Sequence, residues 1–246
     1  MAMSRFTAFF YHIAISLVIF VILAYLIVEI WYPEFFFAID GGWEGIRLVI
    51  GVDLVLGPLL TLVVFKSGKP GLKFDLGCIG ALQTLCLIAG VFVIYTERPV
   101  YFIFYDKHFY SASADTYRNY GVEPPSLTEN SQTFPIKVIS KLPDHPIEKA
   151  GFLTIIFQDN IPAWIYRPTY LDLSDHMDEV IVSGTSEVEM RGRDKKGNLD
   201  RWLAKHGGEF DEYAFIPVHS RYRDAFIGIS KAKKLFVDII EIPPPT

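Results

Sequence analysis

Side chains that could carry out catalysis or bind a metal are present in this sequence, but their spacing forms no recognisable site. None of the six histidines lies at metal-ligand spacing from another, and HExxH, GxSxG and phosphate-loop motifs are absent. Cys78 and Cys86 are eight residues apart in an apolar run, which indicates neither a disulfide framework nor a metal site. We therefore predict no catalytic residue, no cofactor and no metal. The histidines are His12, His108, His145, His176, His206 and His219.

Two polar clusters in the second half of the chain are better explained as surface features. Asp175, Asp178 and Glu179 lie together in DHMDE, and acidic residues are common at helix starts, where the helix dipole favours them. Residues 183–187 (SGTSE) and 191–196 (RGRDKK) are expected to form solvated turns. The net charge of −5 gives no basic footprint, so we predict no nucleic-acid partner.

A carboxylate interrupts a long apolar run. Residues 48–65 read LVIGVDLVLGPLLTLVVF, and Asp53 lies about 10 Å from the outer end of the apolar segment 46–65 that contains them. An ionisable residue at membrane depth faces protein or water rather than lipid. Gln83 in the next run is the obvious internal partner, but the sequence predicts an axial gap of about 10 Å between them. Three alternatives stay open: Asp53 is protonated, it bonds a group of the first apolar run, or it meets another chain.

Small and helix-breaking residues follow this carboxylate. Pro58 after Gly57 predicts a kink that frees carbonyl groups near Leu54, and small residues allow another helix to approach closely. We predict a partner-binding site in the membrane made by Asp53, Gly57, Pro58 and Gln83.

Three apolar segments are long enough to position these residues within a membrane. A bilayer core needs about 20 apolar residues in a helix, and residues 9–31, 46–65 and 76–95 qualify. The first segment is too long for a signal peptide and no small-x-small cleavage site follows it, so we expect an uncleaved anchor. Nearly all the long apolar runs fall in the first hundred residues, which explains the 51% hydrophobic content.

Charges in the short loops predict the orientation of the three spans. Basic residues favour the cytoplasmic side, and the two loops differ sharply in charge. The N-terminus and the second loop are therefore expected in the cytoplasm, with the first loop and all residues after 95 outside, which in a bacterium is the periplasm. The basic residues are Arg5, Lys66, Lys69 and Lys73, and the acidic ones in the first loop are Glu34, Asp40 and Glu44.

The remainder of the chain has the pattern of an α+β domain. Strands are expected at 100–106 and 152–158, a short helix within 142–152, and a loop over 122–134. Residues 197–208 predict a helix capped by Asn198, with Leu199 and Trp202 on one face and Gly207 at its end. Three short runs, YAFIPVHS, AFIGIS and LFVDIIEI, predict antiparallel strands, and PPPT predicts an extended tail.

These patterns together predict the fold class and the domains. We expect three N-terminal transmembrane helices in residues 1–96, followed by a periplasmic α+β domain with an antiparallel sheet in residues 97–246.

The apolar segments also carry a family resemblance. The run GGWEGIRLVIGVDLVLGPLLTLVVFKSGKPGLKFDLGCIGALQ and the later VIYTERPVYFIF resemble the type IV pilin accessory proteins (the FimB/TfpX/TfpZ group). The most specific stretches are GVDLVLGPLLTLVVFK and GLKFDL. The resemblance covers the whole chain and is strongest up to about residue 105. It implies an inner-membrane protein that helps a pilin reach the fibre, and it implies no enzymatic activity and no defined site residues.

The function expected from the residues and the resemblance is a non-enzymatic, chaperone-like accessory factor. Its partners would be the lipid bilayer and a type IV pilin, whose transmembrane helix would meet the spans and whose head would meet the outer domain. Asp53 would bond a polar group of the pilin helix, such as its charged N-terminus. One alternative is a membrane-bound enzyme modifying pilin or envelope components, although more spans or a recognisable site would be expected. Another is a periplasmic ligand sensor, although little of the chain would face the cytoplasm. The sequence leaves the oligomeric state open.

Overall fold

The computed structural model describes residues 4–125 and 134–242. The chain divides into two compact units, the helical unit Met1–Arg98 and the sheet unit Pro99–Thr246. The predicted tail at 243–246 and most of the predicted loop at 122–134 lie outside the described residues.

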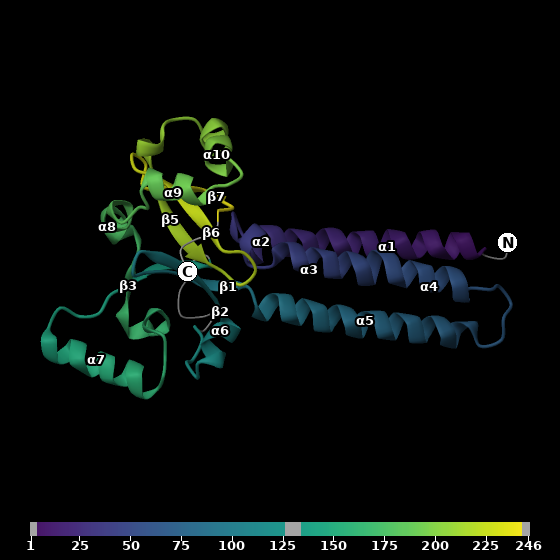
Figure 1. The fold of residues 1–246 in the computed structure, drawn as a ribbon. Helices are drawn as coiled ribbons and strands as arrows, with labels where there is room; N and C mark the ends of the chain where they lie inside the picture. The colour runs from purple at the N-terminus through teal and green to yellow at the C-terminus, as the bar shows by residue number, and fades with distance from the viewer. Residues whose placement is uncertain (1–3, 126–133, 243–246) are drawn as a thin grey trace. The chain divides into compact units, whose positions relative to one another are not determined.

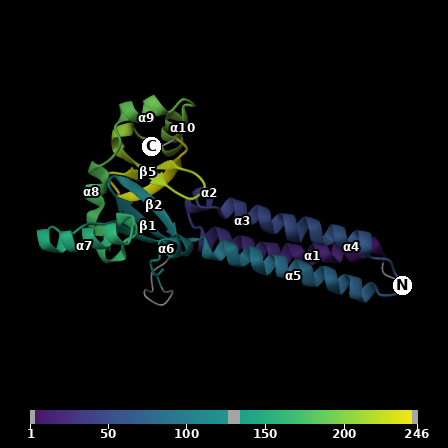
Figure 2. The same cartoon turned by 60° about the horizontal axis from the view of Figure 1, so that its bottom comes forward.

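The helical unit contains three long apolar helices. They comprise residues Arg5–Trp31, Gly42–Val64 and Leu72–Thr96, with lengths of 27, 23 and 25 residues and mean hydropathies of 2.9, 2.1 and 2.2. Each is long and apolar enough to cross a bilayer, which requires about 20 residues. Figures 1 and 2 both show them lying side by side. Their segments are α1 (Arg5–Tyr25), π-helical η1 (Leu26–Trp31), α2 (Phe36–Ile39), α3 (Gly42–Val49), π-helical η2 (Ile50–Leu56), α4 (Gly57–Val64) and α5 (Leu72–Thr96).

The three predicted spans are confirmed as helices, but each begins four residues earlier than predicted. The predicted bounds followed the apolar residues alone, whereas backbone hydrogen bonding starts before the apolar run. The second helix starts after Gly41, whose φ of +105° suits glycine, and the third starts after Gly71 at φ +80°. These earlier starts move Asp53 and Gln83 deeper along their helices.

Close helix contacts depend on small residues facing large ones. A Cβ on Gly45 would lie 3.1 Å from Cδ1 of Ile94, and a Cβ on Gly90 would lie 2.5 Å from Cδ2 of Leu48. These two interlocking pairs bring α3 against α5. In addition, the Tyr32 hydroxyl donates to the Ile94 carbonyl at 2.8 Å, which joins the chain after the first helix to the third.

The sheet unit is built on a seven-stranded mixed sheet in the order β4-β3-β1-β2-β5-β6-β7. Four of the six neighbouring pairs are antiparallel, and the pairs β1–β3 and β2–β5 are parallel. The predicted fold class is confirmed, with these two parallel pairs as a refinement. The strands are β1 (Pro99–Tyr105), β2 (His108–Ser113), β3 (Ile136–Ser140), β4 (Tyr170–Asp172), β5 (Tyr213–His219), β6 (Ala225–Ser230) and β7 (Leu235–Ile240).

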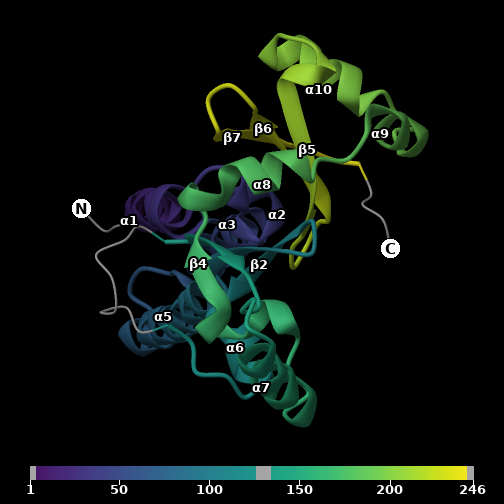
Figure 3. The ribbon, with the colours of Figure 1, turned by 90° about the vertical axis from the view of Figure 1, so that its left-hand side faces the viewer.

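Two hydrophobic clusters pack on this sheet. One joins Leu199 and Trp202 to Phe215 and Phe226, and the other joins Tyr117 and Ile165 to residues of β1 and β3. Figure 3 shows α9 and α10 beside β5, with α6 toward the other end of the sheet. The helices are α6 (Ala114–Asn119), α7 (Pro146–Gln158), α8 (Met177–Val182), α9 (Glu187–Arg193) and α10 (Asn198–His206), and the 3-10 turns are η3 (Ala163–Ile165), η4 (Arg167–Thr169), η5 (Ser174–His176) and η6 (Phe210–Glu212).

The strand predicted at 152–158 is wrong, because these residues belong to α7. The short helix expected just before them is the start of the same element, with Pro146 in its first turn. An apolar run of this length fits a strand or a helix equally well by composition. The Phe152 ring lies 5.5 Å from that of Tyr166, and Ile156, one turn later, is buried. This spacing of four residues is the helical one.

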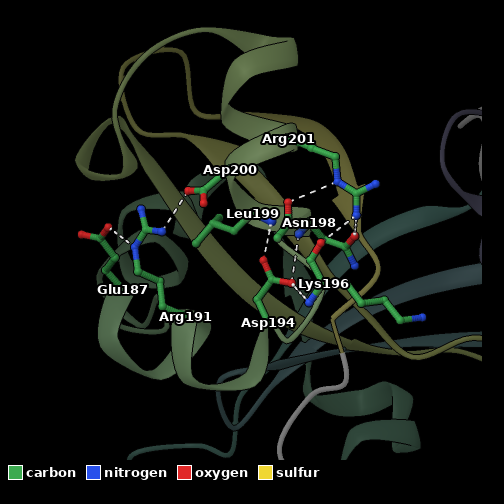
Figure 4. Close-up of polar contacts among 9 residues, drawn as sticks. Glu187, Arg191, Asp194, Lys196, Asn198, Leu199, Asp200 and Arg201 are labelled. Atoms are coloured by element: carbon green, nitrogen blue, oxygen red, sulfur yellow. Dashed lines mark hydrogen bonds and ion pairs between the residues drawn. The ribbon is translucent and has the colours of Figure 1, made fainter.

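The helix predicted near residue 198 is confirmed as α10, which ends at Gly207, and Leu199 and Trp202 are buried on one face. Its cap differs from the prediction. Asn198 is already helical, and the Asp194 carboxylate accepts hydrogen bonds from the backbone N–H groups of Leu199 at 2.7 Å and Asn198 at 2.9 Å (Figure 4). This carboxylate precedes the helix and satisfies the free N–H groups of its first turn, as an N-cap side chain would.

Candidate functional site

One hydrogen-bonded chain of polar side chains connects all three long helices of the helical unit. The Thr61 hydroxyl lies 2.6 Å from Nδ1 of His12, and Nε2 of His12 lies 3.0 Å from Oε1 of Gln83. Nε2 of Gln83 in turn donates to Oδ1 of Asp53. We call these four residues the polar relay. It brings together two of the predicted site residues, Asp53 and Gln83, with two that the prediction omitted.

The direction of each hydrogen bond follows from the Gln83 amide. Its NH₂ group donates to the carboxylate, so its carbonyl oxygen faces the imidazole and needs a donor. Nε2 of His12 therefore carries a hydrogen. In the neutral imidazole, Nδ1 then accepts from the Thr61 hydroxyl, so every member of the relay is oriented by its neighbour.

The predicted axial gap between Asp53 and Gln83 is wrong. Asp53 is eleven residues after Gly42 and Gln83 is eleven residues after Leu72, so both lie near the middle of their helices. At 1.5 Å per residue, each side chain is about 16 Å from the start of its helix. The prediction placed them about 10 Å apart because it started the helices at the apolar residues. Asp53 consequently has a partner within its own chain.

Gly57 makes room for the relay. A Cβ at this position would lie 2.5 Å from Nε2 of Gln83, well inside van der Waals contact. The amide therefore fits against the second helix only because residue 57 has no side chain. The sequence predicted Gly57 as a docking position for another chain, and in this structure the space is filled by Gln83.

Pro58 has a specific effect on the backbone beside Asp53. The seven residues before Gly57 form the π-helical segment η2, in which the Gly57 N–H donates to the carbonyl of Val52. The next donor in that register would serve the Asp53 carbonyl, but proline has no N–H. Nε2 of Gln83 lies 3.5 Å from this carbonyl oxygen. The carbonyl group that the predicted kink leaves without a backbone donor is therefore that of Asp53. Short π-helical segments are frequent at functional sites.

The relay is largely enclosed by the helical unit. Asp53 is 2% exposed and Thr61 is 5% exposed. Oδ2 of Asp53 is buried, and none of the described residues donates a hydrogen bond to it. An unpaired buried carboxylate oxygen costs about 1–3 kcal/mol or more. It is therefore the position in the relay that can still accept a hydrogen bond from a further donor.

The clusters predicted to be surface features make ion pairs at the surface, but the turn predicted at 191–196 is wrong for residues 191–193, which end helix α9. Asp178 pairs with Lys234 at 2.7 Å and Glu179 with Lys141 at 2.6 Å. Figure 4 shows Arg191 between Glu187 and Asp200, at 2.6 and 2.8 Å. Within residues 4–125 and 134–242, no three His, Cys, Asp or Glu side chains are grouped closely enough to hold a metal ion.

A buried tyrosine pair in the sheet unit is best explained by structure rather than chemistry. The hydroxyls of Tyr117 and Tyr170 are 2.8 Å apart, and that of Tyr170 donates to the Trp164 carbonyl at 2.9 Å. Burial raises the pKa of both phenols far above the ordinary tyrosine value. They therefore stay neutral and serve as hydrogen-bonding groups inside one of the two hydrophobic clusters.

Sequence comparison finds relatives for part of the chain. It is 35% identical over 96 residues, or 38% of its length, to each of three fimbrial assembly proteins of Dichelobacter nodosus. The aligned stretch spans 72% of the protein of serogroups C1 and C2, and 37% of those of serogroups I and E1. No protein-family model and no solved structure matches the chain.

Proposed function

Because the chain belongs to the family of these fimbrial assembly proteins, we propose that it is a non-enzymatic, chaperone-like inner-membrane accessory factor for a type IV pilin. It binds the pilin and supports its stability or its assembly into the pilus. The relatives are named as fimbrial assembly proteins, which agrees with the resemblance of the chain, strongest up to about residue 105, to the pilin accessory proteins.

The main support for the proposal is that the helical unit places its polar groups inside and apolar side chains on its outer surface. Its polar groups bond one another across the three helices, while its outer surface is apolar, including Val63 at 79% and Leu85 at 66% exposure. Gly51, Gly77 and Gly80 have open space where a Cβ would stand. Small residues on an apolar surface let a further helix pack closely in lipid. This surface suits a partner that crosses the membrane once.

The proposed orientation follows the charges of the loops. The N-terminus and the lysine-containing loop between α4 and α5 face the cytoplasm, and the sheet unit lies in the periplasm. The helical unit then meets the pilin's transmembrane helix and the sheet unit meets the pilin's head. A cysteine-labelling assay with a membrane-impermeant reagent tests this, in a background with Cys78 and Cys86 replaced by serine and a single cysteine at Gly68 or at exposed Lys233. Labelling at position 68 in intact cells would contradict the orientation.

We propose that the pilin contact in the membrane involves Asp53, Gly57, Pro58 and Gln83. Oδ2 of Asp53 accepts a donor from the pilin helix, such as its charged N-terminus. Asp53 is 2% exposed, so the donor reaches it only after the helices separate locally. Asp53→Asn keeps an acceptor for Gln83 but removes the charge, and co-purification of pilin is expected to fall. The matched control is Asp75→Asn, which removes a carboxylate paired with Lys69 at the start of α5. Unchanged pilin binding in Asp53→Asn would refute this contact.

The proposal as a whole is tested by deleting the gene and measuring surface pili and total pilin. We expect surface pili to fall, while pilin persists in the membrane or is degraded there. Reintroducing the gene restores surface pili. Unchanged surface pili under pilus-producing conditions would overturn the accessory function.

A further inference from the structure

A small pocket lies on the sheet unit, beside the hydrophobic cluster that contains Trp202 and Phe215. It encloses about 350 Å³ between the end of α8, the turn that follows it, η6 and the start of β5. Its lining residues are Ile181, Val182, Gly184, Thr185, Phe210, Tyr213, Ala214 and Lys231.

Backbone contacts fix the walls of this pocket. The Thr185 N–H donates to the Phe215 carbonyl at 2.9 Å, which holds the turn after α8 against β5. The Lys231 N–H donates to the Glu212 carbonyl at 3.0 Å, which holds the turn after β6 against η6. A Cβ on Gly184 would lie 3.2 Å from Cβ of Ala214, so the turn already packs tightly. The pocket is therefore formed before any ligand arrives.

The lining of the pocket combines apolar side chains with polar groups and one cation. Val182, on its rim, is 86% exposed and can be reached from solvent. Among the described residues, no carboxylate lies within 4.0 Å of the Lys231 ammonium, whereas Lys234 in the same turn pairs with Asp178. The site thus favours a ligand that combines an apolar group with a negative charge.

The size of the pocket restricts that ligand. Sites for cofactors and drug-sized molecules occupy roughly 300–1,000 Å³, so this pocket lies at the lower limit of the range. It is large enough for one or two side chains. Apolar anchors in small, preformed pockets dominate many protein–protein interfaces, and a flanking charge pair adds specificity.

We propose that this pocket binds the soluble head of the pilin through an apolar side chain flanked by a carboxylate. The apolar side chain enters between Val182 and Phe210, and the carboxylate pairs with Lys231. This inference rests on the proposed function, and it assigns the second of the two contacts, the one outside the membrane. A second copy of the chain is the main competing occupant.

The test is photo-crosslinking in cells that produce pili, with a benzophenone amino acid placed at single positions of the full-length chain. Position 182 reports on the pocket. Position 63, where Val63 is 79% exposed on α4, reports on the membrane contact. Position 147, where Ile147 is 78% exposed on α7, is an apolar control on the same unit as the pocket. Antibodies against pilin and against this chain identify the products.

We expect pilin to be captured at positions 182 and 63, and not at position 147. Lys231→Glu is expected to reduce capture at position 182 by about tenfold and to leave capture at position 63 unchanged, because only the head contact loses its charge pair. Lys233→Glu, in the same turn but outside the pocket lining, is the matched control and should have little effect.

The outcomes separate this inference from the proposed function. Capture of pilin at position 63 but not at 182, or equal capture at 182 and 147, overturns the pocket while the accessory function stands. Capture of a second copy of this chain at 182 also overturns it. Loss of pilin capture at every position, together with normal surface pili in the deletion strain, removes the proposed function itself.

Discussion

The helical unit and the sheet unit distribute polar and apolar side chains in opposite ways. In the helical unit, Phe10 is 64% exposed and Leu85 is 66% exposed, while Asp53 is buried at 2%. In the sheet unit, Phe102 and Phe215 are completely buried, and the ion pairs lie on the surface. A helix surrounded by lipid gains nothing from hiding apolar groups, but it must satisfy every polar group internally.

This difference shows which interactions specify each unit. The sheet unit depends on the removal of apolar area from water, about 25 cal/mol per Å², and on the fit of its aromatic side chains. The helical unit has no such driving force between helices, so close packing and interhelical hydrogen bonds determine which faces meet. The polar relay provides the interhelical hydrogen bonds, and the glycines opposite large side chains provide the close packing.

The largest expected effect comes from removing a buried aromatic ring in the sheet unit. Phe215→Ala should lower the free energy of unfolding of that unit by about 3–5 kcal/mol, because a cavity remains beside Trp202 and Phe210. The measurement is the urea midpoint for unfolding of the sheet unit, detected by proteolysis of the full chain in detergent. Phe157→Ala is the control, since that ring is 78% exposed, and its expected change is within about 0.5 kcal/mol. Equal changes would mean that the cluster does not stabilise the unit.

A smaller effect is expected from adding one methyl group in the helical unit. Gly57→Ala places a Cβ against the Gln83 amide and should destabilise the three-helix packing by about 1–3 kcal/mol. Gly51→Ala, in the same helix, meets nothing within 4 Å and should be neutral or slightly stabilising. The measurement is resistance of the helical unit to unfolding by SDS in mixed micelles. Equal behaviour of the two variants would show that the relay does not depend on close contact at Gly57.

The smallest effect is expected from the capping carboxylate of α10, and it should depend on pH. Burial opposes ionisation of Asp194, but the backbone N–H groups of Leu199, Asn198 and Lys196 outweigh it and lower its pKa. Its contribution is therefore complete above the ordinary aspartate pKa of about 3.9 and is lost as the pH falls through the lowered value. Asp194→Ala should cost the sheet unit about 1 kcal/mol at pH 7 and almost nothing near pH 2.

The control for this prediction is Asp211→Ala, which removes an exposed carboxylate in η6. Urea unfolding at both pH values measures the two variants side by side. A cost for Asp194→Ala that persists unchanged near pH 2 would show that the side chain acts through packing rather than as an ionised acceptor.

Several elements could be predicted from the sequence because their signal is local. The three spans need only continuous apolar residues, and the terminal strands β5, β6 and β7 are short β-branched and aromatic runs between turns. α10 follows from its apolar face and Gly207. The run at 152–158 was misassigned because its apolar residues lack the alternation that separates strand from helix. In the structure, Phe152 contacts Tyr166, which follows the helix in the chain, and Ile156 is buried one turn later.

The candidate site was only half predictable. Asp53 and Gln83 were recognised as polar residues within apolar runs, but His12 and Thr61 were omitted. A signal for His12 existed, since a histidine inside a transmembrane helix needs a partner as much as a carboxylate does. Its pairing with Gln83 could not be read from the sequence, because helix starts misjudged by four residues shift the depth by about 6 Å.

The sequence by itself determined that three helices are apolar enough to cross a membrane and that an α+β unit follows them, because hydropathy and short-range patterning are properties of consecutive residues. Only the tertiary structure decided that Thr61, His12, Gln83 and Asp53 form one relay, and that Gly57 and Pro58 shape its surroundings. Those contacts depend on the rotation and depth of each helix relative to the others. Rotation and depth are set by packing between residues up to 71 positions apart, which no local pattern records.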